Sequence, residues 1–153
     1  MTLLNALRVV RLSALYDLVV TAGFSFAVTA PVIFDGLGAL HKNLGLTGST
    51  PDPSDPFTVM FANLMGSVVT VWALFRILRP SLAAGAADVG ARVLFSLGMS
   101  AALVQGASPL LLLMLILEIF WALAQSIALL AGRRAGTSNR SSTDKVPPIA
   151  AAT

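Results

Sequence analysis

The stretch PLLLLMLILEIFWALAQSIALL, residues 109–130, decides how this chain folds. It contains a single ionisable side chain, Glu118, and it is followed closely by Arg133 and Arg134. A helix of this length reaches about 33 Å at ~1.5 Å rise per residue, enough to cross a hydrocarbon layer of about 30 Å. The stretch therefore predicts a transmembrane helix whose far end is marked by the two arginines.

The composition of the whole chain is that of a membrane protein. Hydrophobic residues make up 56% and charged residues 11%, with a mean hydropathy of +0.84, whereas soluble domains average about 25% charged residues. The basic residues are scattered over span ends and the tail, without an aromatic-basic surface, so we expect no nucleic-acid binding. The chain has no cysteine and one histidine, His41, which excludes thiolate chemistry and a multi-histidine metal site. We expect no metal and no cofactor.

Three further apolar stretches complete the predicted domain. The expected spans are residues 13–34, 57–78, 89–106 and 109–130, all within a membrane domain of residues 1–132. The connection 35–56 is rich in proline and glycine, so we expect it to lie in water, with a short surface helix in GALHKNLGL. Residues 133–153 are polar and lack periodicity, which predicts a disordered tail. The predicted fold class is an all-α integral membrane protein, an antiparallel bundle of four transmembrane helices.

Small residues recur at four-residue spacing in two of these spans, a pattern that lets helices approach closely in lipid. The residues concerned are Ala62, Gly66 and Thr70 in the second span and Gly98, Ala102 and Gly106 in the third. We therefore expect Gly66 and Gly98 to lie at helix contacts.

The basic residues also predict an orientation. With four spans, nine of the ten lysines and arginines fall on one side of the membrane, and only Lys42 lies on the other. The positive-inside rule then places both termini in the cytoplasm and residues 35–56 outside.

Glu118 is the first candidate for function, because it lies about 14 Å into its span and near the middle of the membrane. A charge at this depth costs several kcal/mol, so we expect a protonated or paired carboxyl that faces other helices. Thr21, Ser25 and Ser67 reach a comparable depth, and Gln125 lies on the same helical face as Glu118. Two interpretations stay open: a site for a proton, a cation or a cationic or lipid-like ligand, and a neutral hydrogen-bonded clasp between helices.

A second group of ionisable residues is expected at a shared depth near the cytoplasmic face. It consists of Asp17, Arg76, Asp88 and Arg92. Ion pairs at span ends fix the register of neighbouring helices, so we interpret this group as an electrostatic latch. Tyr16 and Trp72 are expected to serve as anchors at the membrane interface.

Three segments resemble a known type of protein: YDLVVTA at 16–22, FANLMGSVVTVWALFRILRP at 61–80 and LEIFWALAQ at 117–125. They are similar to a group of small, uncharacterised four-span proteins of the bacterial inner membrane, and the general plan is similar to that of DoxX-like proteins. The resemblance implies a membrane bundle. It brings no activity, cofactor or catalytic residue.

No motif for nucleophilic catalysis or phosphate binding is present, since the chain lacks GxSxG and GxGxxG. These features favour an interaction or accessory component of the membrane, acting as a homo-oligomer or within a larger complex, and not an enzyme. The lipid bilayer is the partner that the composition indicates, and no small-molecule ligand is identified. Two alternatives stay open: a small proton- or cation-coupled transporter using Glu118, and a membrane enzyme acting on a lipid or quinone through Glu118 and Asp17.

Overall fold

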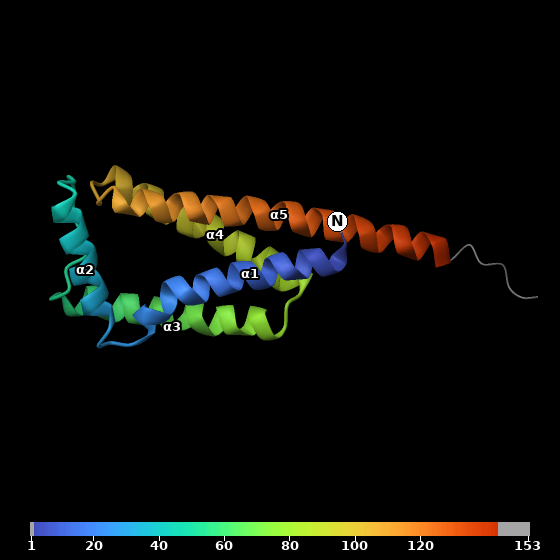
Figure 1. Cartoon of the computed structure of the whole chain (residues 1–153), viewed down its shortest axis with the longest axis horizontal. Coiled ribbons are helices and arrows are strands. Elements are labelled where there is room, and N and C mark those ends of the chain that lie inside the picture. Colours follow the sequence, from blue (N-terminus) through green and yellow to red (C-terminus); the bar gives the residue numbers. More distant parts are fainter. Residues whose placement is uncertain (1, 144–153) are drawn as a thin grey trace, which may run out of the picture.

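The computed structural model describes the backbone of residues 2–143 and the side chains of residues 2–134. This part of the chain is helical. Its elements are α1 (Leu3–Thr21), the 3-10 turn η1 (Ala22–Ser25), α2 (Ala30–Asn43), α3 (Pro56–Leu78), α4 (Leu82–Val104) and α5 (Leu110–Thr143). Helices α1, α3, α4 and α5 run along the long axis of the molecule, and α2 crosses one end of it (Figure 1). The all-helical class predicted from the sequence is confirmed.

Three of these helices are long and apolar enough to cross a membrane. They cover Pro56–Leu78, Leu82–Val104 and Leu110–Arg134, and the number rises to four if α1, η1 and α2 count as one bent span. Only 11% of the most apolar part of each helix is buried, and large side chains such as Leu113 and Leu97 are more than half exposed. A surface this apolar is suited to lipid and indicates a multi-pass membrane protein.

The first predicted span, residues 13–34, is not one continuous helix. Helix α1 ends at Thr21, and α2 begins at Ala30 after a bend of 107°. Pro31 lies in the first turn of α2, where its missing N–H is harmless, whereas inside a longer helix its ring would clash with the carbonyl four residues earlier. The hydroxyl of Thr29 donates to the carbonyls of Gly23 and Phe26, which stabilises the bend.

The other predicted boundaries are closer to those observed. Helix α3 matches the predicted span 57–78 to within one residue. Helix α4 begins at Leu82 instead of residue 89, because Ser81 caps it by accepting a hydrogen bond from the Ala84 N–H at 3.0 Å and the alanines that follow favour helix. Helix α5 continues to Thr143. Residues 133–143, for which we predict disorder, are therefore helical, and no proline interrupts the helix there. Residues 144–153 of the predicted tail lie outside the described residues.

Helix α1 packs against both α3 and α5, while α4 packs mainly against α5. Gly66 in α3 is buried against η1, where an added Cβ atom would lie 2.6 Å from Cβ of Phe24. Gly85 in α4 similarly faces Val10 of α1, with 2.8 Å between an added Cβ and a methyl of Val10. Gly98, in contrast, has no neighbour within 4 Å of such an atom. The expectation of a helix contact is therefore right for Gly66 and wrong for Gly98, whose face of α4 has no neighbouring helix.

The end of the molecule that carries α2 is closed by backbone hydrogen bonds between two distant turns. Ser49 donates from its N–H to the Gly106 carbonyl at 2.9 Å, and the Ser108 N–H donates to the Ser49 carbonyl at 2.8 Å. The Ser108 hydroxyl also lies 2.8 Å from Nδ1 of His41 in α2. Gly48 has a φ of +102°, and a Cβ there would meet the Gly106 carbonyl oxygen at 2.7 Å, so the approach of the two turns requires glycine.

The exposed Asp52 and the partly exposed Asp55 order the loop before α3. Asp55 caps α3 by accepting hydrogen bonds from the N–H groups of Phe57 and Thr58, and the Thr58 hydroxyl lowers the pKa of Asp55. Asp52 accepts from the hydroxyl and N–H of Ser54, which lowers its pKa in the same way. A lowered pKa in the folded state means that these contacts stabilise the loop fully above the ordinary carboxyl pKa and lose their effect as the pH falls through the lowered values.

The packing difference between the two glycines gives the first testable prediction. Gly66→Ala forces Phe24 and the η1 backbone away from α3, so we expect a loss of about 1–3 kcal/mol in the free energy of unfolding. Gly98→Ala is the matched control on an open face and is expected to leave stability unchanged or to raise it by up to about 1 kcal/mol through helix propensity. Thermal unfolding of both variants in detergent measures the difference. Equal stability of the two variants would contradict the observed packing.

Candidate functional site

Five ionisable side chains meet between the four long helices. They are Asp17 of α1, Arg76 of α3, Asp88 and Arg92 of α4, and Glu118 of α5, and we call them the charge cluster. All five are buried, and the relative exposure is 0% for Arg76 and 1% for Arg92. A buried arginine needs carboxylate partners, because its guanidinium group does not lose its proton in proteins.

Arg92 is the centre of the charge cluster, since it contacts all three carboxylates. Its Nη1 donates to Oε2 of Glu118 at 2.7 Å, and its Nε donates to Oδ2 of Asp88 at 3.0 Å. Its Nη2 donates to both carboxylate oxygens of Asp17 at 2.8 Å. One guanidinium group thus joins α1, α4 and α5.

Arg76 attaches α3 to the same carboxylates. It forms an ion pair with Asp17, and its Nη1 lies 2.7 Å from Oδ2 of Asp88. Its guanidinium carbon lies 5.6 Å from the centre of the Trp72 ring, one helical turn earlier. The Trp72 indole in turn donates from Nε1 to Asp88 Oδ1 at 3.2 Å. Trp72 therefore belongs to the charge cluster's surroundings, while its role as an interface anchor stays a prediction.

Neutral polar groups complete the surroundings of the charges. Ser13 donates from its hydroxyl to Oε1 of Gln125 at 2.8 Å and accepts from Nη1 of Arg76 at 3.2 Å. Gln125 donates from Nε2 to the Gly85 carbonyl at 3.0 Å. This chain of hydrogen bonds ties α1 to α4 and α5 on the side of the cluster away from Glu118.

The cluster contains one more carboxyl group than it has guanidinium groups. If every group were ionised, the buried site would carry one net negative charge, which is costly inside a membrane. Asp17 and Asp88 each contact both arginines, whereas Glu118 contacts only Arg92. Its second oxygen, Oε1, has no hydrogen-bond partner among the side chains that the structure describes. Glu118 is therefore the carboxyl group best placed to hold a proton or to face a cation.

A cavity of about 480 Å³ adjoins Glu118, within the size range of small-molecule sites. We call it the charged cavity. Its polar lining comes from Asp17, Asp88, Arg92, Glu118, Tyr16, Thr21 and Trp72, and its apolar lining includes Met65, Met99, Met114 and Phe95. The Tyr16 hydroxyl is buried without a hydrogen-bond partner among the described residues, an unusual state for a polar group that a ligand could relieve.

The structure brings some of the predicted site residues together and separates others. The four latch residues meet as expected, but Glu118 joins them instead of forming a separate site. The expected hydroxyl partners do not bond Glu118, which is a correction. Thr21 lines the charged cavity together with Glu118, but its hydroxyl donates to the Asp17 carbonyl. Ser25 bonds Thr70. Ser67 donates to the Ser25 carbonyl.

Gln125 does lie in the polar surroundings of the cluster, but it bonds Ser13 and the Gly85 carbonyl and not Glu118. The sequence places Ser13 on one ridge of its helix with Asp17, Thr21, Ser25 and Thr29 at four-residue spacing, and we interpret that ridge as a packing face and not as part of a site. Ser13 precedes Asp17 by four residues, just as Trp72 precedes Arg76 and Asp88 precedes Arg92. Residues four apart share a helical face, so these pairs indicate one polar face on each helix.

Within residues 2–134, no group of three or more histidine, cysteine, aspartate or glutamate side chains is placed to hold a metal ion. Comparisons with protein families, characterised proteins and solved structures gave no match. The resemblance to four-span proteins of the DoxX-like plan therefore stays a prediction.

The central position of Arg92 gives a second prediction. Arg92→Met leaves three carboxyl groups facing one guanidinium group, and we expect it to lower the free energy of unfolding in detergent by about 3–5 kcal/mol. Arg79→Met, at an exposed position, is the control and is expected to change stability little. Adding Glu118→Gln to Arg92→Met removes one unpaired acid, so it should restore part of the loss. A Glu118→Gln change that further destabilises the Arg92→Met protein would argue against the charge balance described above.

Proposed function

We propose that this chain is a four-span antiparallel bundle of the bacterial cytoplasmic (inner) membrane with both termini in the cytoplasm. We further propose that it binds a small amphipathic cation in the charged cavity in exchange for a proton on Glu118. The observation that carries the second proposal is the excess carboxyl group of the charge cluster, placed at the wall of a cavity.

The orientation is supported by where the basic residues lie. The start of α1, the end of α3 and the later part of α5 lie at the end of the molecule opposite α2 (Figure 1). These segments carry or adjoin Arg8, Arg11, Arg79, Arg133 and Arg134, whereas Lys42 is in α2. Arg76 and Arg92 are neutralised inside the cluster and add little to this asymmetry. The remaining residues still favour a cytoplasmic location for the arginine-rich end.

This orientation is testable because the chain has no cysteine. Thr47→Cys lies in the loop before α3, and Arg79→Cys lies at the exposed end of α3. In intact cells, a membrane-impermeant maleimide is expected to label the first variant, and to label the second only after permeabilisation. The reverse pattern would overturn the proposed orientation.

The lining of the charged cavity supports an amphipathic cation as ligand. Its excess carboxyl group attracts a cation, and the aromatic rings of Tyr16 and Trp72, which lie beside the guanidinium groups of Arg92 and Arg76, extend the lining. The methionines Met65, Met99 and Met114 form an adaptable apolar wall. A ligand with one positive charge and an apolar body matches both parts of this lining.

Charge balance explains the exchange. In the empty state, a proton on Glu118 removes the third carboxylate charge, and the cluster is neutral because Asp17 and Asp88 balance the two arginines. When a cation enters, the Glu118 proton leaves to water and the net charge of the site is unchanged. Glu118 is the member of the charge cluster with a single ion pair, while Asp17, Asp88 and both arginines are fixed in multiple ion pairs.

An acid-base enzyme using Glu118 and Asp17 receives less support. Both oxygens of Asp17 accept hydrogen bonds from guanidinium groups, so Asp17 is not free to take a proton from a substrate. The accessory role remains the second proposal, supported by the open face of α4 around Gly90 and Gly98, where a second copy or another membrane helix could pack closely.

Titration calorimetry of the purified protein tests the exchange, with tetraphenylphosphonium as the cationic probe and triphenylphosphine oxide as its neutral relative. One proton released per cation means that affinity for the cation rises about tenfold per pH unit while Glu118 is protonated. Affinity for the neutral compound should not depend on pH. Glu118→Gln is expected to abolish the pH dependence, and Glu118→Asp to retain it, with thermal unfolding showing that both variants fold.

Two results would contradict this proposal. Unchanged, pH-dependent binding by Glu118→Gln would remove Glu118 from the exchange. Absence of cation binding by the native protein, together with a larger assembly in native mass spectrometry, would favour the accessory role instead.

A further inference from the structure

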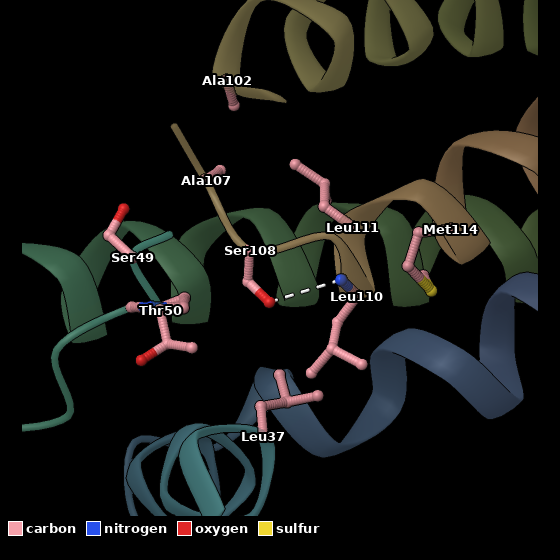
Figure 2. Close-up of a pocket in the computed structure, with 10 residues that line it drawn as sticks. Leu37, Ser49, Thr50, Ala102, Ala107, Ser108, Leu110, Leu111 and Met114 are labelled. Carbon is pink, nitrogen blue, oxygen red and sulfur yellow. Dashed lines mark hydrogen bonds between the residues drawn. The ribbon is translucent and has the colours of Figure 1, made fainter. Parts of the chain in front are cut away.

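A second cavity, of about 380 Å³, lies at the end of the molecule that carries α2 (Figure 2). We call it the loop cavity. Leu37 of α2, the segment 49–51 and the turn before α5 enclose it, and the labelled hydroxyl side chains Ser49, Thr50 and Ser108 come from the loop segment and that turn. No part of the charge cluster lines this cavity, so it is distinct from the site described above.

Met114 lines both cavities. On α5, Leu110 lines the loop cavity and Glu118 lines the charged cavity, each four residues from Met114. Residues four apart lie above one another on a helix, so one face of α5 runs from the loop cavity past Met114 to the carboxyl group. Helix α4 repeats this order, with Ala102 at the loop cavity and Met99 at the charged cavity.

We infer that the loop cavity is the entrance to the charged cavity and that Met114 is the residue that separates them. This inference rests on the proposed binding at Glu118. The methionine side chain is unbranched, with three rotatable bonds, and can move aside without a shift of the backbone. Hydroxyl groups at the loop end and apolar walls further in form a lining that an amphipathic cation could follow from water. In the proposed orientation this entrance faces the outside.

The segment 49–51 is held at the mouth of the loop cavity by the Ser49 backbone hydrogen bonds to Gly106 and Ser108. These bonds keep the segment against the α4–α5 turn, and the pairing of Ser108 with His41 keeps α2 beside it. The mouth is therefore a fixed frame, and Met114 is the mobile part that the inference requires.

Cysteine modification tests the route without using the unknown ligand. The probe is [2-(trimethylammonium)ethyl] methanethiosulfonate, a permanently charged cation that does not cross lipid, and intact-protein mass measures the rate of modification. Met99→Cys reports the charged cavity and Ser49→Cys reports the loop cavity, each in an otherwise cysteine-free chain. Right-side-out and inside-out vesicles show from which side each is reached.

We expect Met99→Cys to be modified from the same side as Ser49→Cys. Adding Met114→Trp is expected to slow modification of Met99→Cys by at least about tenfold, since an indole ring fills the passage, and Met114→Ala is expected to accelerate it. Leu113→Trp, one residue away on the exposed face of α5, is the matched control and should have no effect. Thermal unfolding in detergent shows that the variants are folded, and modification of Ser49→Cys at its usual rate in every background shows that the loop end is unchanged.

The inference is overturned if Met99→Cys is reached only from the side opposite Ser49→Cys, or from neither side. It is also overturned if Met114→Trp and Leu113→Trp slow the reaction equally, or if Met114→Ala leaves the rate unchanged. These outcomes are independent of Glu118. A failure of proton exchange in calorimetry would remove the proposed function and leave the measured route in place.

Discussion

The guanidinium group of Arg92 must find carboxylates inside a membrane, and the arrangement of the long helices depends on that requirement. Lipid chains are as apolar as leucine, so burial of apolar surface does little to hold helices together there. A buried arginine cannot become neutral, so its cost is met by nearby acids. Arg92 draws Asp17 of α1 and Glu118 of α5 to α4, and Arg76 adds α3 through Asp17 and Asp88. At the depth of the charge cluster, the position of each long helix follows from the need to pair the guanidinium groups of Arg76 and Arg92 with carboxylates.

Much of the secondary structure could be predicted because the relevant signals are local. Asp55 and Pro56 begin α3, Arg79 and Pro80 follow its end, and the apolar run from residue 109 defines the first part of α5. The latch residues could be assigned a common depth by counting along helices of constant rise. The predicted depths are wrong beyond the bend before Pro31, because an interruption of the helix shifts the depth of every later residue in that span.

The partners of Glu118 could not be predicted by depth alone. Thr21, Ser25 and Ser67 have suitable depths, but depth does not determine which way a side chain points around the helix axis or which helices are neighbours. Gly66 and Gly98 illustrate the same limit, since both belong to small-residue patterns and only Gly66 meets another element. Which helices touch is decided by contacts between distant parts of the chain, here mainly the ion pairs of the charge cluster.

The residues of the charge cluster contribute unequally to stability and to the proposed binding. Arg92, Asp17 and Asp88 each take part in at least two ion pairs, so a change in the charge of any of them disturbs several helices at once. Glu118 has one ion pair and lies at the cavity wall, so under the proposed function its charge can be exchanged while the remaining pairs hold α1, α3 and α4 in place. The charge cluster connects helices α1 and α3 with helices α4 and α5, and the cavities lie between the cluster and α2. A site that alternates between a proton and a cation needs this division, with fixed charges that keep the helices assembled and one carboxyl group whose partner can change.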